Sequence, residues 1–170
     1  MLQLERRISG FPGINLRLYS VYGPLEDTSR LIPQALRFAA RGKFPPFAHP
    51  QTSRDFVYVD DVCEAFLKAP QMVKHKENPV DFNIGTGQKT SLREFAELLG
   101  ALFGLTGEPR FDGAVGRHWD RKDWVSDPSR AKLMMKWEAR TQLPEGLLKT
   151  AEWVNELTSE QFSRSSIRGA

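Results

Sequence analysis

Apolar and polar positions change period along the chain, and these changes mark the predicted elements. Segment 14–23, INLRLYSVYG, alternates like a strand, and segment 54–59, RDFVYV, also has the pattern of a strand. Helical spacing follows in 29–42 and again in 60–73. Strands therefore alternate with helices, which indicates an α/β fold.

The two helices are predicted to bury one apolar row each. In segment 29–42 this row is Ile32, Ala35, Leu36 and Ala39. In segment 60–73 it is Val62, Phe66, Ala69 and Val73. The second helix begins with Asp61 and Glu64 at the spacing of a capping box.

Residues 82–100, FNIGTGQKTSLREFAELLG, resemble the start of a nucleotide-binding fold. The dinucleotide motif G-x-G-x-x-G requires a third glycine where Thr90 stands, and a Walker A loop requires glycine at Gln88. The alternative is a strand, a tight Gly-Thr-Gly turn and a helix capped by Thr90 or Ser91. That alternative satisfies every position.

The rest of the chain adds shorter elements. Residues 2–9 are expected to end a helix, 109–113 to form a short strand, and 128–136 and 143–158 to form two closing helices. Residues 1–158 are therefore predicted to form a single α/β unit with one core. Residues 160–170 are predicted to be a frayed tail.

Composition excludes several classes of protein. The 170 residues are 40% hydrophobic and 26% charged, as in ordinary globular proteins, and no apolar run approaches the length of a membrane span. Cys63 is the single cysteine, so no internal disulfide can form, which fits a cytoplasmic protein. Its position among apolar neighbours predicts a small buried residue.

Charge and histidine spacing argue against nucleic acid and metal. The net charge is +3, and the basic residues are spread along the chain rather than clustered as in nucleic-acid binders. His49, His75 and His118 have no metal-binding spacing among themselves or with Cys63, so no metal is predicted.

Three groups of segments together resemble one family. LRLYSVYGP at 16–24 is similar to R-x-x-N-x-Y-G-P, and RDFVYVDDV at 54–62 is similar to R-D-[FY]-[IV]-[YH]-V-x-D. The third group runs from FNIGTG through SDPSRAKLMMKW to LPEGLLKTAEW at 143–153. Their order and spacing resemble the extended short-chain dehydrogenase/reductases, the NAD(P)-dependent epimerases, dehydratases and reductases of nucleotide sugars.

The resemblance implies the carboxy-terminal part of an extended Rossmann-type fold: the last strands of the parallel sheet plus a small mixed α/β substrate-binding domain. In the family, a G-x-x-G-x-x-G loop and a catalytic Tyr-x-x-x-Lys lie upstream of these motifs, and the 170 residues contain neither in the expected place. NAD or NADP is thus expected in the complete protein, with none bound by this chain alone. The chain alone is expected to be inactive.

The resemblance also implies a phosphate site. Arg54 matches the arginine that reaches the nucleotide diphosphate, although a salt bridge to Asp55 or Asp61 would explain it as well. Arg117 and Asp120 match an R-x-G-D motif that meets phosphate and ribose, or else they form a loop ion pair of little energy.

The resemblance also assigns expected roles to several single residues. Ser20 replaces a family asparagine that contacts the diphosphate, and Arg30, followed by Leu31, could add a second cation or be a solvated residue of the first helical turn. Three more expectations concern the bases and rings: Phe47 lines the nucleobase, Trp124 lies near the sugar or packs as a lid, and the backbone of Leu18 and Tyr19 borders the nicotinamide.

Two hypotheses follow. The first is the nucleotide-sugar-binding half of an NAD-dependent epimerase or dehydratase, whose ligand is a nucleotide-diphosphate sugar. The alternative is a non-catalytic sugar-nucleotide-binding module or partner subunit. Neither requires nucleic acid or a membrane, and a homodimer is compatible with both.

Overall fold

A computed structural model describes residues 2–10, 13–73, 81–112 and 123–165. The helices are α1 (Leu2–Ser9), α2 (Leu31–Ala39), α3 (Val59–Val73), α4 (Leu92–Phe103), the π-helix η1 (Ala131–Met135), α5 (Leu143–Glu156) and α6 (Ser159–Ser165). The strands are β1 (Asn15–Leu18), β2 (Ser20–Tyr22), β3 (Ser53–Arg54), β4 (Phe56–Tyr58), β5 (Asp81–Ile84) and β6 (Thr90–Ser91). Parallel pairs flanked by helices confirm the predicted α/β class.

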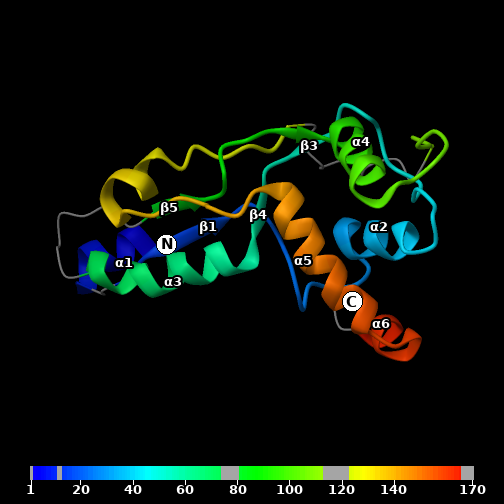
Figure 1. Cartoon of the computed structure of the whole chain (residues 1–170). Helices are drawn as coiled ribbons and strands as arrows, with labels where there is room; N and C mark the ends of the chain where they lie inside the picture. Colours follow the sequence, from blue (N-terminus) through cyan, green and yellow to red (C-terminus); the bar gives the residue numbers. More distant parts are fainter. Residues whose placement is uncertain (1, 11–12, 74–80, 113–122, 166–170) are drawn as a thin grey trace.

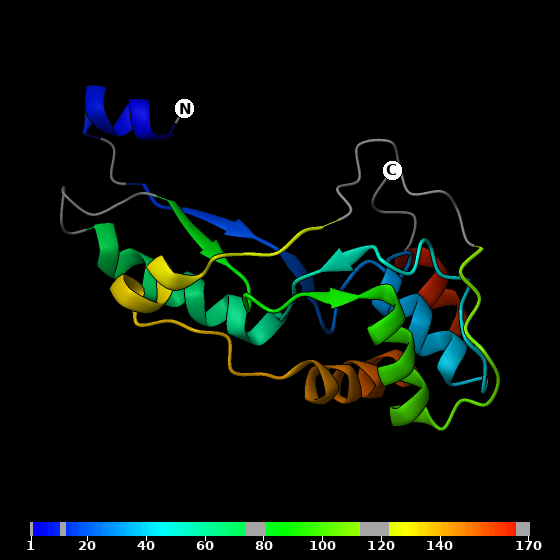
Figure 2. The same ribbon diagram turned by 90° about the horizontal axis from the view of Figure 1, so that it is seen from above.

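The molecule is elongated, with helices gathered at its two ends (Figure 1). One end holds α3 and η1 beside β1 and β5, and the other holds α2, α4, α5 and α6. Helix α1 stands apart from both groups, beyond β1 (Figure 2). Within the described ranges, no helix combines the length and apolar character needed to cross a membrane.

The predicted strand over 14–23 is two strands with different partners. β1 pairs in parallel with β5, and β2 pairs in parallel with β4. The change occurs at Tyr19, whose N–H donates to the carbonyl of Ile84, while the next N–H, of Ser20, donates to Asp55. One continuous alternating pattern therefore serves both ends of the molecule.

Two hydrophobic clusters replace the single core expected from the sequence. One lies among α2, α4 and α5, and the other among α3, β5 and η1. Strand β4 joins them, because Phe56 and Tyr58 belong to the first cluster and Val57 to the second. Successive side chains of a strand point to opposite faces, so three residues serve two cores.

Helix α2 confirms its predicted face, but α3 does not. All four predicted residues of α2 are buried. In α3, Phe66 is 54% exposed, and Cys63 is exposed rather than buried. The buried row of α3 is instead Val62, Ala65, Ala69 and Met72, together with the carboxyl-bearing Asp61.

The capping box predicted for α3 is also wrong. The helix begins at Val59, so Asp61 already lies in its first turn. The Asp61 carboxylate accepts a hydrogen bond from the backbone N–H of Thr141, 3.0 Å away. Glu64 forms an ion pair with Lys68 along the helix. Asp61 therefore ties α3 to the segment before α5 instead of capping its own helix.

The cap of α4 is confirmed. The Ser91 hydroxyl accepts from the N–H of Glu94, and the Glu94 carboxylate accepts from the N–H of Ser91. Gly104 ends the helix in the left-handed conformation that favours glycine. The Gly-Thr-Gly stretch is thus a turn between β5 and a conventionally capped helix.

Three short predictions need correction. Residues 109–112 form no strand, and the helix expected over 128–136 is a π-helix of five residues, η1. The frayed tail predicted from residue 160 is wrong for its first residues, which belong to α6. Phe162 of this helix is buried in the first cluster. A hydrogen bond from the Thr28 hydroxyl to the Phe162 carbonyl holds α6 in place.

Gly146 in α5 should tolerate no side chain. A Cβ built there would lie 2.0 Å from the Tyr22 hydroxyl oxygen. We expect Gly146→Ala to lower the free energy of unfolding by about 1–2 kcal/mol, since overpacking costs more than the gain in helix propensity returns. Chemical denaturation measures the loss. Adding Tyr22→Phe should recover part of it, because the Tyr22 hydroxyl makes only a long 3.5 Å bond to Leu143; an unchanged deficit would contradict the steric explanation.

Candidate functional site

A small cavity of about 90 Å³ lies between β2, the start of α2 and β3. Its polar or charged lining residues are Ser20, Glu26, Arg30 and Arg54. Leu31 and apolar side chains of β2, α2 and β4 complete the wall. The structure thus brings together four of the residues expected to bind substrate: Ser20, Arg30, Leu31 and Arg54.

Backbone pairing between strands places Ser20 and Arg54 at the small cavity. In the β2–β4 pair, Ser20 lies opposite Phe56, and the Ser20 N–H donates to the Asp55 carbonyl at 2.9 Å. Arg54 is the residue before Asp55 and ends β3, and this register brings it to the same cavity as Ser20. An Arg54 Nη1–H donates to the Ser53 carbonyl at 2.8 Å, which steadies the guanidinium.

Arg30 occupies the N-cap position of α2 with extended backbone angles. Its side chain is well exposed, and its Nε–H donates to Glu26 Oε1 at 3.1 Å. The two arginines therefore approach the cavity from separate segments. A cluster of guanidinium groups of this kind suits the recognition of phosphate oxygens.

Glu26 is the charged residue of this cavity that the sequence did not indicate. Its side chain is only 12% exposed, and burial raises the pKa of the carboxyl to about 7 although Arg30 opposes the shift. Oxygen Oε2 is buried, and no described residue donates to it. A single acid in the loop after Gly23-Pro24 carries no periodic or motif signal, so the sequence could not identify it.

The raised pKa makes stability depend on pH. Ionised Glu26 is disfavoured in the folded state, so its favourable contribution is complete below about pH 4.5 and is lost as the pH rises through about 7. Between about pH 5.5 and pH 7.5 the free energy of unfolding should fall by roughly 1–2 kcal/mol. Denaturation curves at both values check this, and Glu26→Gln should flatten the trend; an equal slope in the variant would contradict it.

A wider cavity of about 590 Å³ adjoins the small one. It is lined by Leu18 and Tyr19, the residues expected to border the nicotinamide, and by the loop after β2. Glu26 and Arg30 line both cavities. The Tyr19 ring also lies 5.9 Å from that of Trp124, so the expected cofactor and sugar positions are neighbours.

Asp55 holds the surrounding loops together. Its carboxylate is fully buried and accepts hydrogen bonds from backbone N–H groups of Thr86, Gly87 and Ser126 and from the hydroxyls of Thr86 and Ser126. The Asp55 carboxylate is thus directed at these residues and not at Arg54. Together with the Asp61 bond to Thr141, this geometry does not favour the salt bridges considered from the sequence.

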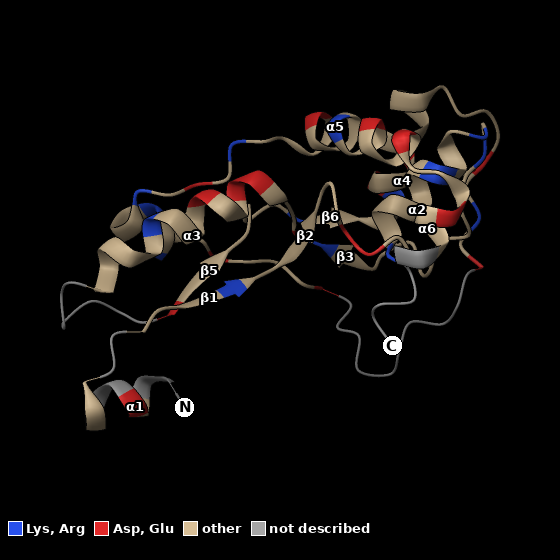
Figure 3. Cartoon of the chain, turned by 90° about the horizontal axis from the view of Figure 1, so that it is seen from below, with Lys and Arg blue, Asp and Glu red and all other residues tan. Residues whose placement is uncertain are grey.

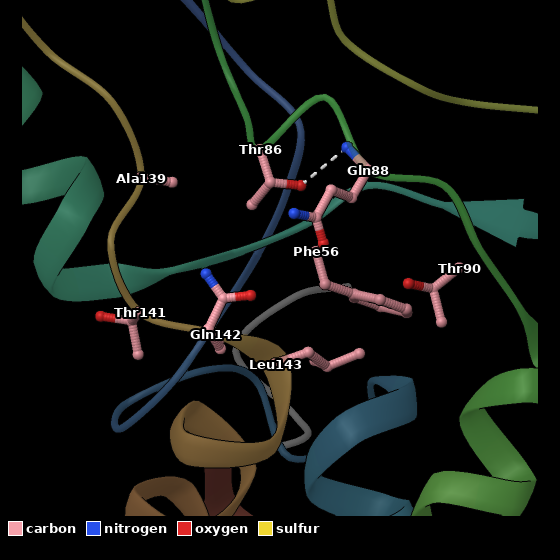
Figure 4. A pocket seen from close by; sticks show the side chains of 8 residues that line it. All are labelled: Phe56, Thr86, Gln88, Thr90, Ala139, Thr141, Gln142 and Leu143. Carbon is pink, nitrogen blue, oxygen red and sulfur yellow. Dashed lines mark hydrogen bonds between the residues drawn. The ribbon is translucent and has the colours of Figure 1, made fainter.

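Beside Asp55 is a narrow hollow of about 40 Å³ (Figure 4). Thr86 and Gln88 face it from the Gly-Thr-Gly turn, where the Gln88 N–H donates to the Thr86 hydroxyl at 3.1 Å. Thr141 and Gln142 face it from the segment that leads into α5, and the Phe56 ring lies between the two sides. The turn that resembles a phosphate loop therefore borders a space far smaller than a nucleotide.

The remaining predicted residues lie elsewhere. Phe47 is only 1% exposed and packs against Phe95 and Phe111, so its ring offers a nucleobase no free face. Arg117 and Asp120 fall outside the described residues. Lysine and arginine are distributed over both ends of the described molecule rather than over one face (Figure 3).

Comparisons with known proteins indicate the family of the chain. Residues 1–85 match the family described as NAD dependent epimerase/dehydratase. Over 152 residues the chain is 32% identical to a trifunctional UDP-glucose 4,6-dehydratase, epimerase and reductase of Arabidopsis thaliana. That match covers 88% of this chain and 22% of the plant protein.

Solved structures give the same result. A UDP-glucose 4-epimerase of Thermotoga maritima, determined with UDP-glucose, is 31% identical with a TM-score of 0.80, covering 91% of this chain and 50% of the other. MoeE5, determined with UDP-glucose and NAD, is 29% identical with a TM-score of 0.66, covering 82% of this chain and 46% of the other. The chain therefore spans about half or less of the proteins it matches.

Proposed function

Because the chain belongs to the NAD dependent epimerase/dehydratase family, we propose that it forms the nucleotide-sugar-binding half of such an enzyme. The observation that carries this proposal is the small cavity, where Arg30 and Arg54 converge from segments far apart in the sequence. Two guanidinium groups and the Ser20 hydroxyl match the charge and the acceptor oxygens of a diphosphate.

The wider cavity would hold the sugar and the reactive end of the cofactor. The similar MoeE5 structure contains both UDP-glucose and NAD, which supports an NAD-dependent reaction in the whole protein. NAD, when bound, supplies hydride acceptance and return. The residues of this chain would bind and orient: Arg54 and Arg30 hold the phosphates, Leu18 and Tyr19 border the nicotinamide, and Trp124 covers the sugar.

Isothermal titration calorimetry tests the proposal directly. UDP-, dTDP-, CDP- and GDP-sugars are titrated into the protein, and saturable binding of at least one is expected. Absence of binding by all four at millimolar concentration would contradict it. Conversion of the bound sugar nucleotide to an epimerised or dehydrated product by the complete protein with added NAD would then separate an enzyme from a non-catalytic binding module, since both bind and only the enzyme changes the sugar.

A further inference from the structure

Glu26 is the buried ionisable group that a diphosphate pocket alone does not explain. A carboxylate beside two arginines would repel the phosphates that those arginines attract. It nevertheless lines both cavities, at the point where they adjoin. Its side chain is only 12% exposed, so its position is set by the packing around it.

The two carboxyl oxygens of Glu26 differ in what they contact. Oε1 accepts from Arg30 Nε, whereas Oε2 is buried with no hydrogen-bond partner among the described residues. A buried polar atom without a hydrogen-bond partner destabilises the protein. A ligand that supplies this partner therefore binds more tightly. If Oε2 carries a proton, it becomes a donor in the wall of a cavity that two arginines also line, and a small turn of the carboxyl would present it to an anion.

We propose that Glu26 is a ligand-binding residue: Oε1 fixes Arg30, and protonated Oε2 donates a hydrogen bond to a phosphate oxygen held by Arg30 and Arg54. This inference rests on the proposed function, because it takes the phosphate to be that of a nucleotide sugar. The ligand then meets two cations and one neutral donor instead of two cations and an opposing anion. Binding takes up one proton wherever free Glu26 is ionised.

The neighbouring groups leave Glu26 as the group that titrates near neutrality. The charged groups around it are Arg30 at the start of α2, Asp27 in its own loop and Arg54 on β3. Burial raises the pKa of Tyr22, which also lines the cavity, so that phenol stays neutral. The pKa of Glu26, raised to about 7 chiefly by burial, gives roughly equal amounts of acid and carboxylate at neutral pH.

Calorimetry with UDP-glucose tests the inference, because its diphosphate keeps the same charge across this range of pH. The affinity of the protein should weaken about tenfold between pH 6 and pH 8, the factor expected for a required proton with a pKa near 7. At pH 7, heats measured in two buffers of different ionisation enthalpy should report uptake of about half a proton.

Glu26→Gln is the matched variant, because its amide keeps the shape, the acceptor for Arg30 and a donor for the phosphate. Its affinity should be independent of pH over the same range, with no proton uptake. Binding by the parent protein without pH dependence or proton uptake, or an unchanged pH dependence in the variant, would overturn the role of Glu26 while leaving the pocket intact. Absence of UDP-glucose binding at every pH, when another nucleotide sugar also fails, would remove the proposed function and this inference together.

Discussion

Replacing Asp55 by alanine is expected to lower the free energy of unfolding by about 3–5 kcal/mol, the largest effect of any single change considered. The substitution removes the acceptor of the Thr86 and Ser126 N–H groups and leaves the Gly87 N–H with the Ser126 hydroxyl alone. Each unsatisfied buried donor costs about 1–3 kcal/mol, although loop relaxation recovers part of the sum. Urea denaturation followed by circular dichroism measures the loss.

Asp127→Ala is the matched control. Asp127 also accepts from a backbone N–H, that of Ser129 at 3.0 Å, but it lies at the surface, where water can take its place. Its loss should lower the free energy of unfolding far less than the loss of Asp55 does. The loss of stability caused by Asp55→Asn should lie between these two losses. The amide keeps one acceptor oxygen, but its NH2 group replaces the other oxygen and faces backbone N–H groups, which are donors themselves. Equal midpoints for Asp55→Ala and Asp127→Ala would show that the buried network adds little to stability.

Helix positions could be predicted from periodicity, but the direction of a helix face could not always be. In α2 the predicted row is buried because it has a single apolar stripe. In α3, apolar residues flank the Val62–Ala69 line on both sides, with Ala65 on one and Phe66 on the other. Packing of η1 and β4 on α3 selects the side with Ala65, and a single sequence does not contain that information.

The pairing of the strands could not be predicted from the sequence either. The alternating segment 14–23 shows that its residues are extended, but it does not show that the chain leaves β5 for β4 at Tyr19. That exchange depends on residues 54–58 and 81–84, which lie tens of positions away. It is also what divides the expected single core in two.

The sequence indicated some residues of the site and missed others, and the difference has a physical reason. Motif likeness indicated Ser20, Arg30 and Arg54, whose gathering in one cavity agrees with the expectation. It did not indicate Glu26, because a buried acid in a loop has no period and no fixed spacing. Asp55 entered only as an alternative partner of Arg54, whereas its contacts run to the Gly-Thr-Gly turn.

Arg54→Ala is expected to weaken the binding of a nucleotide sugar by about 2–3 kcal/mol, which is roughly 30- to 150-fold in the dissociation constant. The side chain combines a charge with a planar set of donors, and hydrogen bonds to a charged group are worth more than neutral ones. Arg54→Lys should recover part of the loss, because it keeps the charge but not the paired donors. Calorimetry with UDP-glucose measures all three affinities.

The control for Arg54→Ala must remove a cation without touching the cavity. Lys132 serves, because it lies on η1, is 66% exposed and pairs with Glu138. Lys132→Ala should leave the dissociation constant within about twofold, since exposed charges at a distance are screened by salt. Thermal melting of each variant shows whether lost binding reflects lost folding, because Arg54 also bonds to the Ser53 carbonyl. A folded Arg54→Ala protein that binds as tightly as Lys132→Ala would place the diphosphate outside the cavity.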